Sequence, residues 1–309
     1  MNKTIHIREA VTPEEVERFW REVHAYHARD IFPDPAEEDR AYFLDDSQYR
    51  AAVQRIHDRD GDRCYYLLFR REGRDIGFAL TALYPSEDGK CFVMEFCVLP
   101  EFRGGGTGTA CARLLLDWAA DRGAQYGELN AADPRRIRFW SRLGFRPNGR
   151  DEWGEPLMLR SPEQALSITV ELLSDPADLQ LRKLENGYLA EIGEPLLTEE
   201  STERLRAAVE QGHIRFLLAY RGCRAVGMCS VAENFSTFCC GPVAVLEDLY
   251  VEPVFRRQGI ARQLTRSAQA LCRERGVGSL TVCCAPCDEA MYQALGFNVP
   301  LGVSRSCLL

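Results

Sequence analysis

The sequence predicts an α/β fold of the α+β type, with helices packed on a mixed sheet, present in two tandem copies. The 309 residues exceed the usual size of one hydrophobic core. A motif of valine, proline, phenylalanine, arginine and glycine recurs after 153 positions. In each copy it joins a strand-like segment to a helix-like one, the order of a parallel crossover. The motif residues are Val98, Pro100, Phe102, Arg103 and Gly106, then Val251, Pro253, Phe255, Arg256 and Gly259.

Other segments repeat in the same order with slightly different offsets. Leu67-Leu68 recurs as Leu217-Leu218 after 150 positions, and the "LGF" that ends at Phe145 recurs at Phe297 after 152 positions. Such a long period with small drift indicates duplicated domains. The polar, proline-bearing segment 160–167 is typical of a linker, so we predict domains at 1–162 and 163–309.

Each copy has the same expected series of elements. Strand alternation, apolar residues at three- and four-residue spacing, and polar turns mark the boundaries. The series is a strand, helical segments, two strands around a turn, a fourth strand, the motif loop, a helix that ends in glycine, a fifth strand, a short helix and final strands. The expected ranges are 4–11, 13–30, 64–84, 92–100 and 109–123 in the first copy, and 167–173, 176–193, 215–233, 243–253 and 261–276 in the second.

Composition narrows the function classes. The net charge of −8 argues against a general nucleic-acid binder, which needs a basic face. No segment approaches the ~20 apolar residues that span a bilayer. The N-terminal segment has no apolar core of a secretory signal. We therefore expect a cytoplasmic protein without nucleic-acid or membrane partners.

The chain has 13 cysteines, most of them in apolar segments. Cys284 and Cys287 form a CxxC pair, but structural zinc needs a second pair at similar spacing, and Cys239-Cys240 are adjacent. In a reducing compartment buried thiols behave as small hydrophobic groups. We expect these cysteines to pack and expect no metal.

The motif loops have the features of an anion site. Glycine permits positive φ, and unpaired N–H groups at a helix start, with the helix dipole, attract a diphosphate. A Walker loop would need a Gly-Lys-Ser/Thr ending, and a dinucleotide fingerprint fits less well. The candidate diphosphate residues are Arg103, Gly104, Gly105, Gly106, Thr107 and Gly108, and Arg256, Arg257, Gln258, Gly259, Ile260 and Ala261.

Together with the "LGF" segments, these loops resemble the coenzyme A motif of the GNAT superfamily of acyl-CoA N-acyltransferases. The resemblance covers both halves and implies two tandem GNAT domains, acetyl-CoA as co-substrate and a primary amine as acceptor, which we expect to be a small molecule. It also implies that pantetheine pairs with the fourth strand near Val98 and Val251, and that main-chain amides of 103–108 and 256–261 hold the diphosphate. The tandem arrangement resembles that of mycothiol synthase.

Because main-chain groups would do the binding, the second loop can lack the glycine run. We expect Arg257, Gln258 and Ile260 to keep negative φ. Gly259 and Ala261 would need to stay small to let the ligand approach.

The family's general acid is often a tyrosine four residues before the glycine of "GF". Tyr292 has this place in the second copy, and Trp140, whose indole cannot release a proton, has it in the first. We therefore expect catalysis in the second domain, while the first binds coenzyme A or supports its partner. Alternatives are a protein lysine or N-terminal acetyltransferase and a non-catalytic acyl-CoA-binding sensor.

For the general base, the fourth strand of the second copy offers Glu247 and Asp248. Strand alternation would place them on opposite faces, so one at most reaches the substrate, and we slightly favour Glu247. The Val251 N–H is the expected oxyanion donor. On the first helix, His24, His27 and Asp30 share a face that we expect to be exposed rather than metal-binding.

Overall fold

The computed structural model describes residues 4–34, 36–45, 48–151, 153–162 and 166–302. The chain divides into two compact units, Met1–Asn148 with Trp153–Gln164, and Gly149–Glu152 with Ala165–Leu309. Each unit contains a mixed sheet with helices, so the predicted fold class is confirmed. The predicted boundary at residue 163 lies outside the described residues. Within the described part of the chain, no helix is both long and apolar enough to cross a membrane.

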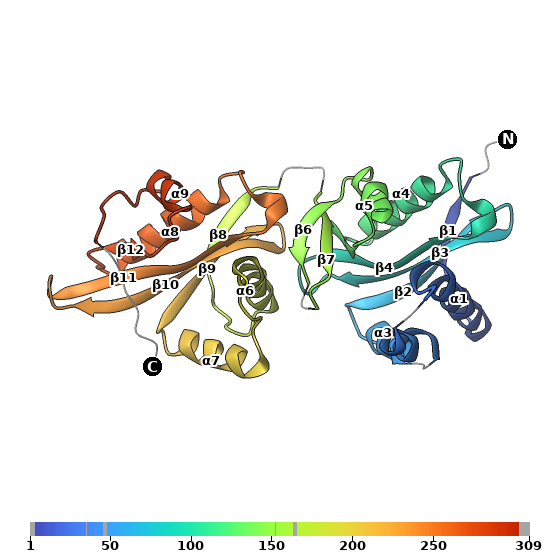
Figure 1. The fold of residues 1–309 in the computed structure, drawn as a ribbon, viewed down its shortest axis with the longest axis horizontal. Coiled ribbons are helices and arrows are strands. Elements are labelled where there is room, and N and C mark those ends of the chain that lie inside the picture. The colour runs from blue at the N-terminus through green and yellow to red at the C-terminus, as the bar shows by residue number, and fades with distance from the viewer. Residues whose placement is uncertain (1–3, 35, 46–47, 152, 163–165, 303–309) are drawn as a thin grey trace. The chain divides into compact units, whose positions relative to one another are not determined.

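The first unit is built on a seven-stranded sheet in the order β1-β2-β3-β4-β5-β7-β6. The β4–β5 pair is parallel, as the crossover predicts. Helices α4 and α5 cover one face, and α1 and α3 cover the other (Figure 1). The strands are β1 (His6–Glu9), β2 (Arg63–Arg71), β3 (Arg74–Tyr84), β4 (Lys90–Val98), β5 (Tyr126–Asn130), β6 (Arg146–Arg150) and β7 (Pro156–Arg160). The helices are α1 (Pro13–Tyr26), α2 (Glu37–Asp39), α3 (Gln48–His57), α4 (Thr107–Ala120) and α5 (Pro134–Ser141).

The first helix shows how local sequence sets the elements. Thr12 and Glu15 form a capping box at the start of α1. Phe19, Trp20 and Val23 then face the core at three- and four-residue spacing. Five further residues, His27–Ile31, continue the helix as a π-helical turn. This continuation carries the end of the helix to the motif loop.

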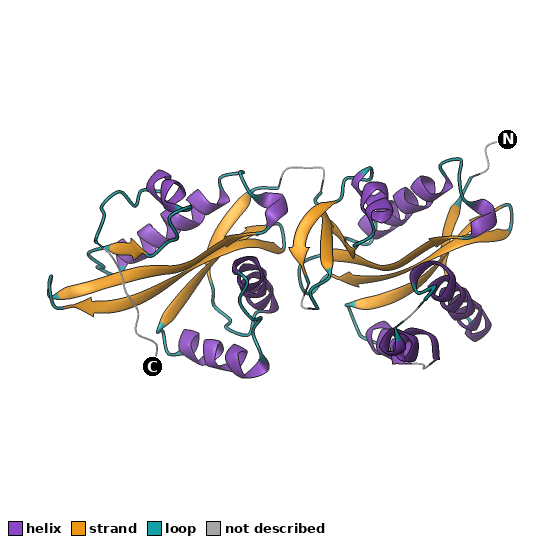
Figure 2. Cartoon of the chain, in the orientation of Figure 1, coloured by secondary structure: helices purple, strands orange, loops and turns teal. Residues whose placement is uncertain are grey.

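The second unit has a five-stranded sheet in the order β12-β11-β10-β9-β8 (Figure 2). We expected final strands after the second "LGF", but no strand follows α9 in the described residues, and β12 forms the edge of the sheet. The strands are β8 (Ile168–Leu172), β9 (Ile214–Arg221), β10 (Arg224–Ser236), β11 (Gly241–Val251) and β12 (Leu280–Val282). The helices are α6 (Leu179–Ile192), α7 (Glu199–Glu210), α8 (Ile260–Glu274) and α9 (Glu289–Ala294).

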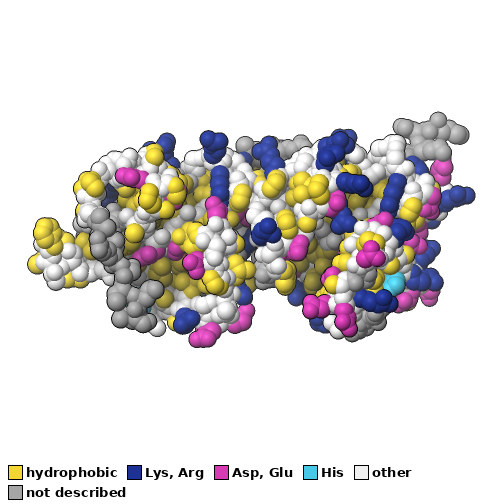
Figure 3. All heavy atoms as spheres, in the orientation of Figure 1, with side chains coloured by type: hydrophobic (Ala, Val, Ile, Leu, Met, Phe, Trp, Pro, Cys, Tyr) yellow, Lys and Arg dark blue, Asp and Glu magenta, His cyan; other side chains and the backbone are white. Residues whose placement is uncertain are grey.

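Strands β10 and β11 form a long hairpin whose end carries exposed aromatic side chains. Phe238 is 99% exposed and Phe235 is 69% exposed. Figure 3 shows the hydrophobic side chains that gather at this end. The hairpin of the first unit has the polar tip 85–89 instead, so the two copies differ at this surface.

Both sheets open where the motif begins. Strand β4 pairs with β5 only over Lys90–Phe92, and β11 pairs with β12 only over Ala244–Leu246. The rest of β4 and of β11 has no partner strand on that side in the described residues. Main-chain groups near Val98 and Val251 are therefore available to an extended ligand.

A glycine in each unit allows close strand contact next to the motif. A Cβ at Gly77 would lie 2.3 Å from the Cys97 carbonyl oxygen, and one at Gly227 would lie 2.8 Å from the Tyr250 carbonyl oxygen. No side chain fits at either distance. These two glycines hold β3 against β4 and β10 against β11 at the start of each motif.

We predict that Gly77→Ala lowers the free energy of unfolding of the first unit by about 2–3 kcal/mol, because the new methyl group overlaps main-chain atoms. The control Gly73→Ala also adds a methyl group, but into open space at a φ of +78°, and should cost about 1 kcal/mol. All four tryptophans lie in the first unit, so intrinsic fluorescence during urea unfolding reports on it. Equal losses for both variants would contradict the proposed overlap.

Candidate functional site

The two motif loops have the same backbone conformation at the helix start. Gly106 and Gly259 are the N-cap residues of α4 and α8, with φ values of 80° and 83°. Neither helix has a side-chain cap. In contrast, Thr12, Asp133, Asp178 and Thr198 cap helices α1, α5, α6 and α7. The first amide of α4, that of Thr107, donates to the Gly104 carbonyl at 3.0 Å, so in this helix the next amides of the first turn are left for a ligand, and in α8 the first amides are left for one.

The space in front of these loops is open. A Cβ built at Gly104, Gly105, Gly106 or Gly259 would meet nothing within 4 Å. The loop glycines are therefore required by positive φ, not by neighbouring protein atoms. Uncapped amides, open space and an unpaired strand edge together fit the diphosphate and pantetheine of coenzyme A.

The motif arginines are bound by the protein itself. The Nε of Arg103 donates to the Val98 carbonyl at 2.8 Å, and its guanidinium pairs with Asp30. Arg256 repeats the arrangement with the Val251 carbonyl at 2.8 Å and with Glu191. Both arginines join the end of the strand to the end of the first helix of their unit. They position the loop.

This arrangement affects Asp30. Burial raises its pKa, but hydrogen bonds from Arg103 and Arg29 outweigh burial and lower the pKa to about 2. Asp30 is therefore ionised at neutral pH and keeps the Arg103 contact charge-assisted.

One expectation about the second loop was wrong. Arg257 has a φ of +62°, in the left-handed region that we expected it to avoid. It stands where Gly104 stands in the first loop, which also has positive φ, but the two turns differ at the next residue, where Gly105 has a φ of +54°. Gln258 and Ile260 are not among the residues with positive φ, as expected. Gln258 accepts from Arg221 at 3.0 Å and donates to the Val254 carbonyl at 3.1 Å.

The other loop residues divide between core and surface. Ile260 is 1% exposed and Thr107 is 8% exposed, so their side chains belong to the core. Ala261 lies in the first turn of α8, where a small side chain leaves its amide accessible. Gly108 has the corresponding place in α4, and a Cβ there would lie 3.4 Å from the Phe139 ring.

A β-bulge at the same place in both units sets the carboxylates. Strand pairing shifts between Leu80 and Thr81 in β3, opposite Met94 and Glu95, and between Cys229 and Val231 in β10, opposite Glu247 and Asp248. The bulge breaks simple strand alternation, on which our preference for Glu247 rested. Glu247 is exposed, whereas Asp248 is half-buried and accepts from the Ser230 hydroxyl at 2.8 Å. The structure favours Asp248 as the carboxylate of this site.

In the first unit one oxygen of the equivalent carboxylate is bound by two side chains. Glu95 Oε1 lies 2.8 Å from His27 Nε2 and accepts from the Tyr49 hydroxyl at 2.9 Å. His27 is 1% exposed, so the expectation of an exposed polar helix face was wrong for this residue. His27 follows Val23 by four residues, so helical spacing places it on the same buried face of the helix. Asp30 is bound to Arg103, and only His24 keeps an exposed position.

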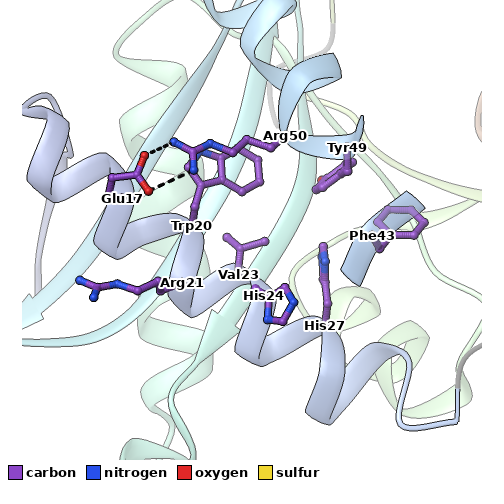
Figure 4. Close-up of a pocket in the computed structure, with 9 residues that line it drawn as sticks. All are labelled: Glu17, Trp20, Arg21, Val23, His24, His27, Phe43, Tyr49 and Arg50. Carbon is purple, nitrogen blue, oxygen red and sulfur yellow. Dashed lines mark hydrogen bonds and ion pairs between the residues drawn. The ribbon is translucent and has the colours of Figure 1, made fainter. Parts of the chain in front are cut away.

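A pocket of about 270 Å³ opens between α1 and α3 in this unit (Figure 4). Aromatic rings and imidazoles form much of its wall, and an ion pair between Glu17 and Arg50 lies at one side, with Arg50 above the Trp20 ring. The lining residues are Glu17, Trp20, Arg21, Val23, His24, His27, Phe43, Tyr49 and Arg50. The pocket adjoins the Glu95 hydrogen bonds through His27 and Tyr49.

The residues before the "LGF" segments have different environments. Trp140 is a core residue that is 6% exposed. Its ring centroid lies 5.2 Å from that of Phe96 and 5.1 Å from that of Phe145. Tyr292 is half-buried beside Phe297. Burial, followed by Tyr188 and Asp288, raises the pKa of Tyr292 to about 12. Its hydroxyl is therefore protonated at neutral pH and can donate a proton.

The second unit also holds an acid that sequence reasoning missed. Glu185 on α6 is 7% exposed, and its Oε1 is buried without a hydrogen-bond partner in the described residues. Burial, and then the charge of Asp248, raise the pKa of Glu185 to about 8. Burial likewise raises the pKa of Asp248, against the hydrogen bond from Ser230. Asp248 also acts on the pKa of Tyr292, so the three groups are close enough to interact.

The sequence held signals for some of these residues. Glu185 interrupts the apolar face formed by Leu181, Leu184 and Tyr188 on α6. An acid is seldom buried at such a position unless it has a partner. The partners of Glu95 come from 46 and 68 residues away, and no local pattern joins them.

The cysteines divide between core and surface. Cys64, Cys91, Cys97, Cys111, Cys229 and Cys272 are buried, as expected for packing, but Cys283 and Cys287 are exposed. Of the residues whose positions are described, no group of three or more His, Cys, Asp or Glu is placed to hold a metal ion.

Comparison with known proteins identifies the fold and the chemistry. The family model described as "Acetyltransferase (GNAT) family" matches residues 20–145 and 180–297, one match in each unit. A thialysine N-ε-acetyltransferase of Caenorhabditis elegans is 34% identical over 77 residues, or 25% of this chain. The chain spans about half, 48%, of that relative's length.

Solved structures also match one unit at a time. An aminoglycoside acetyltransferase from an uncultured soil metagenomic sample, in complex with sisomicin, is 19% identical and has a TM-score of 0.41; the match covers 46% of this chain and 95% of that one. A predicted acetyltransferase with acetyl-CoA from Clostridium acetobutylicum is 17% identical and has a TM-score of 0.40; the match covers 46% of this chain and 96% of that one.

We predict that the second unit loses stability as pH rises from about 5 to about 8. The native Glu185 keeps its proton up to a pKa of about 8, while the unfolded chain loses it near 4.5, so the native state binds more protons in this window. Glu185→Gln should flatten this slope and gain a few kcal/mol at pH 8. Urea unfolding followed by circular dichroism measures the pH dependence of the free energy of unfolding, and tryptophan fluorescence reports the unfolding of the first unit separately. A slope that Glu185→Gln leaves unchanged would contradict the raised pKa.

Proposed function

The chain belongs to the acetyltransferase (GNAT) family and is an acyltransferase, and from that premise we propose that it moves the acetyl group of acetyl-CoA to a primary amine of a small molecule, with the chemistry in the second unit. The family uses acetyl-CoA. The observation that carries the assignment is the contrast between Asp248 with Tyr292 in the second unit and Glu95 with Trp140 in the first. The names of the C. elegans relative and of the soil acetyltransferase agree with an amine acceptor.

In this proposal acetyl-CoA supplies an activated thioester, and the chain supplies its binding site. Main-chain amides of 103–108 and 256–261 hold the diphosphate, except those of Arg103, Thr107 and Arg256, which donate to protein carbonyls, and the free edges at Val98 and Val251 hold pantetheine. The N–H of Glu252, not that of Val251, donates into β10, at 2.9 Å from the Val226 carbonyl oxygen. The Val251 N–H therefore faces the open side and can stabilise an oxyanion there.

The proton transfers follow from the protonation states of the side chains. A protonated amine gives one proton to Asp248, directly or through water, and becomes nucleophilic. A C–N bond forms at the acetyl carbon and the C–S bond breaks. Tyr292 donates its proton to the departing thiolate and regains one from the nitrogen, which loses its second proton as the amide forms. A phenol with a pKa of about 12 holds its proton until the thiolate develops.

The first unit lacks both features of this arrangement. Glu95 already accepts from His27 and Tyr49, and Trp140 is packed in the core. Its loop has three glycines with positive φ and an uncapped helix. These observations support a first unit that binds coenzyme A without being the main catalyst.

We predict that Asp248→Asn lowers kcat by on the order of 10²–10⁴-fold and that Tyr292→Phe lowers it by about 10²-fold, because each removes a proton-transfer group. The matched variant Glu95→Gln changes the corresponding residue of the first unit and should leave kcat near the wild-type value. The assay is thiol release from acetyl-CoA with a panel of primary amines.

A loss of turnover in Glu95→Gln with normal turnover in Asp248→Asn would move the chemistry to the first unit. Absence of thiol release with every amine would instead support the non-catalytic sensor that the sequence leaves as an alternative.

A further inference from the structure

Helix α6 presents Glu185 to the inside of the second unit. The side chain is 7% exposed and its Oε1 has no hydrogen-bond partner in the described part of the chain. A buried carboxylate of this kind is costly unless something fills its acceptor positions. No role in acetyl transfer requires it, since Asp248 and Tyr292 account for the proton transfers.

The packing of α6 on β11 turns Glu185 toward Asp248. A Cβ at Gly187 would lie 2.7 Å from the Tyr250 hydroxyl, so the helix touches the strand closely there. Asp248 is two residues before Tyr250 and shares its face of the strand. Leu181 and Tyr188, four residues before and three residues after Glu185, pack in the cluster that contains Tyr250, so Glu185 lies on the helix face that packs against this side of the sheet. The charge of Asp248 acts on the titration of Glu185. We call Glu185 and Asp248 the acidic pair.

The surroundings of the acidic pair contain no basic group. The polar groups around it are Ser230 on β10, Tyr188 on α6, Tyr292 and Asp288 at α9, and Glu247 on β11. The nearest basic residues on α6 have other partners, since Lys183 lies 3.5 Å from Glu252 and Arg182 lies 2.9 Å from Glu199. Nothing in the described chain neutralises the pair.

In the first unit the corresponding carboxylate has hydrogen-bond donors from the protein. Its strand carboxylate, Glu95, is filled by two donors of the protein, His27 and Tyr49. In the second unit the helix brings an acid instead of a donor. Asp248 and Tyr188 remain partly exposed, so the acidic pair can be reached from solvent.

We infer that the acidic pair binds the ammonium group of the acceptor, and that Glu185 makes the second unit specific for cationic aliphatic primary amines. This inference rests on the proposed function and names its substrate class. An alkylammonium ion offers three N–H donors and one positive charge, which match two carboxylates with free acceptor positions. Asp248 then takes the proton of the reacting nitrogen, while Glu185 fixes the ammonium before transfer.

Binding of an ammonium ion by the acidic pair can be detected without turnover. The buried Glu185 and the half-buried Asp248 interact, so the pair keeps a proton near neutral pH, because ionising both is costly. A bound cation removes that cost and displaces the proton. Binding of the cation should therefore tighten as pH rises toward 8 and should release a proton to the buffer.

The test is isothermal titration calorimetry of the full chain with n-butylamine, with 1-butanol as the uncharged probe of similar size, in buffers of different ionisation enthalpy. We expect n-butylamine to bind, 1-butanol not to bind, and the Kd of n-butylamine to fall by up to about tenfold per pH unit between pH 6 and 8 with proton release. In Glu185→Gln both the pH dependence and the proton release should disappear. Glu194→Gln, which removes an exposed acid just after the same helix, should behave as wild type.

Binding that is independent of pH, equal affinity for 1-butanol, or proton release that persists in Glu185→Gln would overturn the inference. Thiol release separates it from the proposed function. Proton-linked binding without any acetyl transfer would leave the cation site standing and contradict the proposed function. Acetyl transfer to n-butylamine without proton-linked binding would support the proposed function and contradict the cation site.

Discussion

The structure depends on two helices that begin without a cap. At Gly106 and Gly259 a left-handed φ turns the chain so that amides in the first turns of α4 and α8 face open space. Buried amides of this kind are costly when nothing accepts from them. Helices α1, α5, α6 and α7 avoid that cost, because a threonine or aspartate side chain caps each of them. An anionic ligand would accept from these amides, and the remaining features of each motif hold the two loops in this shape.

The motif arginine is the clearest of those features. Arg103 and Arg256 each bind the carbonyl of the last strand residue and an acid at the end of the first helix of the unit. Strand end, loop and helix end are thereby joined at one point. The acids, Asp30 and Glu191, stand at different offsets from their arginines, so the contact was kept while the segments between changed length.

The sequence was sufficient to predict the duplication, the mixed sheet, and the loops that start the two helices, because these follow from local patterns of glycine, proline and apolar residues. It was not sufficient for the carboxylates. A bulge in β11 decides that Asp248 and not Glu247 turns inward, and bulges depend on pairing with β10. The burial of His27 follows the spacing of Val23, but its bond to Glu95 depends on how the helix packs on β4, and no local pattern predicts the positive φ of Arg257. Glu185 shows its importance only when α6 is seen against β11.

The central claim is that main-chain amides in each unit bind the diphosphate of one coenzyme. It is tested most directly by calorimetric titration of acetyl-CoA into the wild type and into Ala261→Pro, which removes one amide donor from the first turn of α8, with Ala261→Ser as the control that keeps the amide. The account predicts two molecules per chain for the wild type and for Ala261→Ser, and one for Ala261→Pro. Two undiminished sites in Ala261→Pro, or none in the wild type, would contradict it.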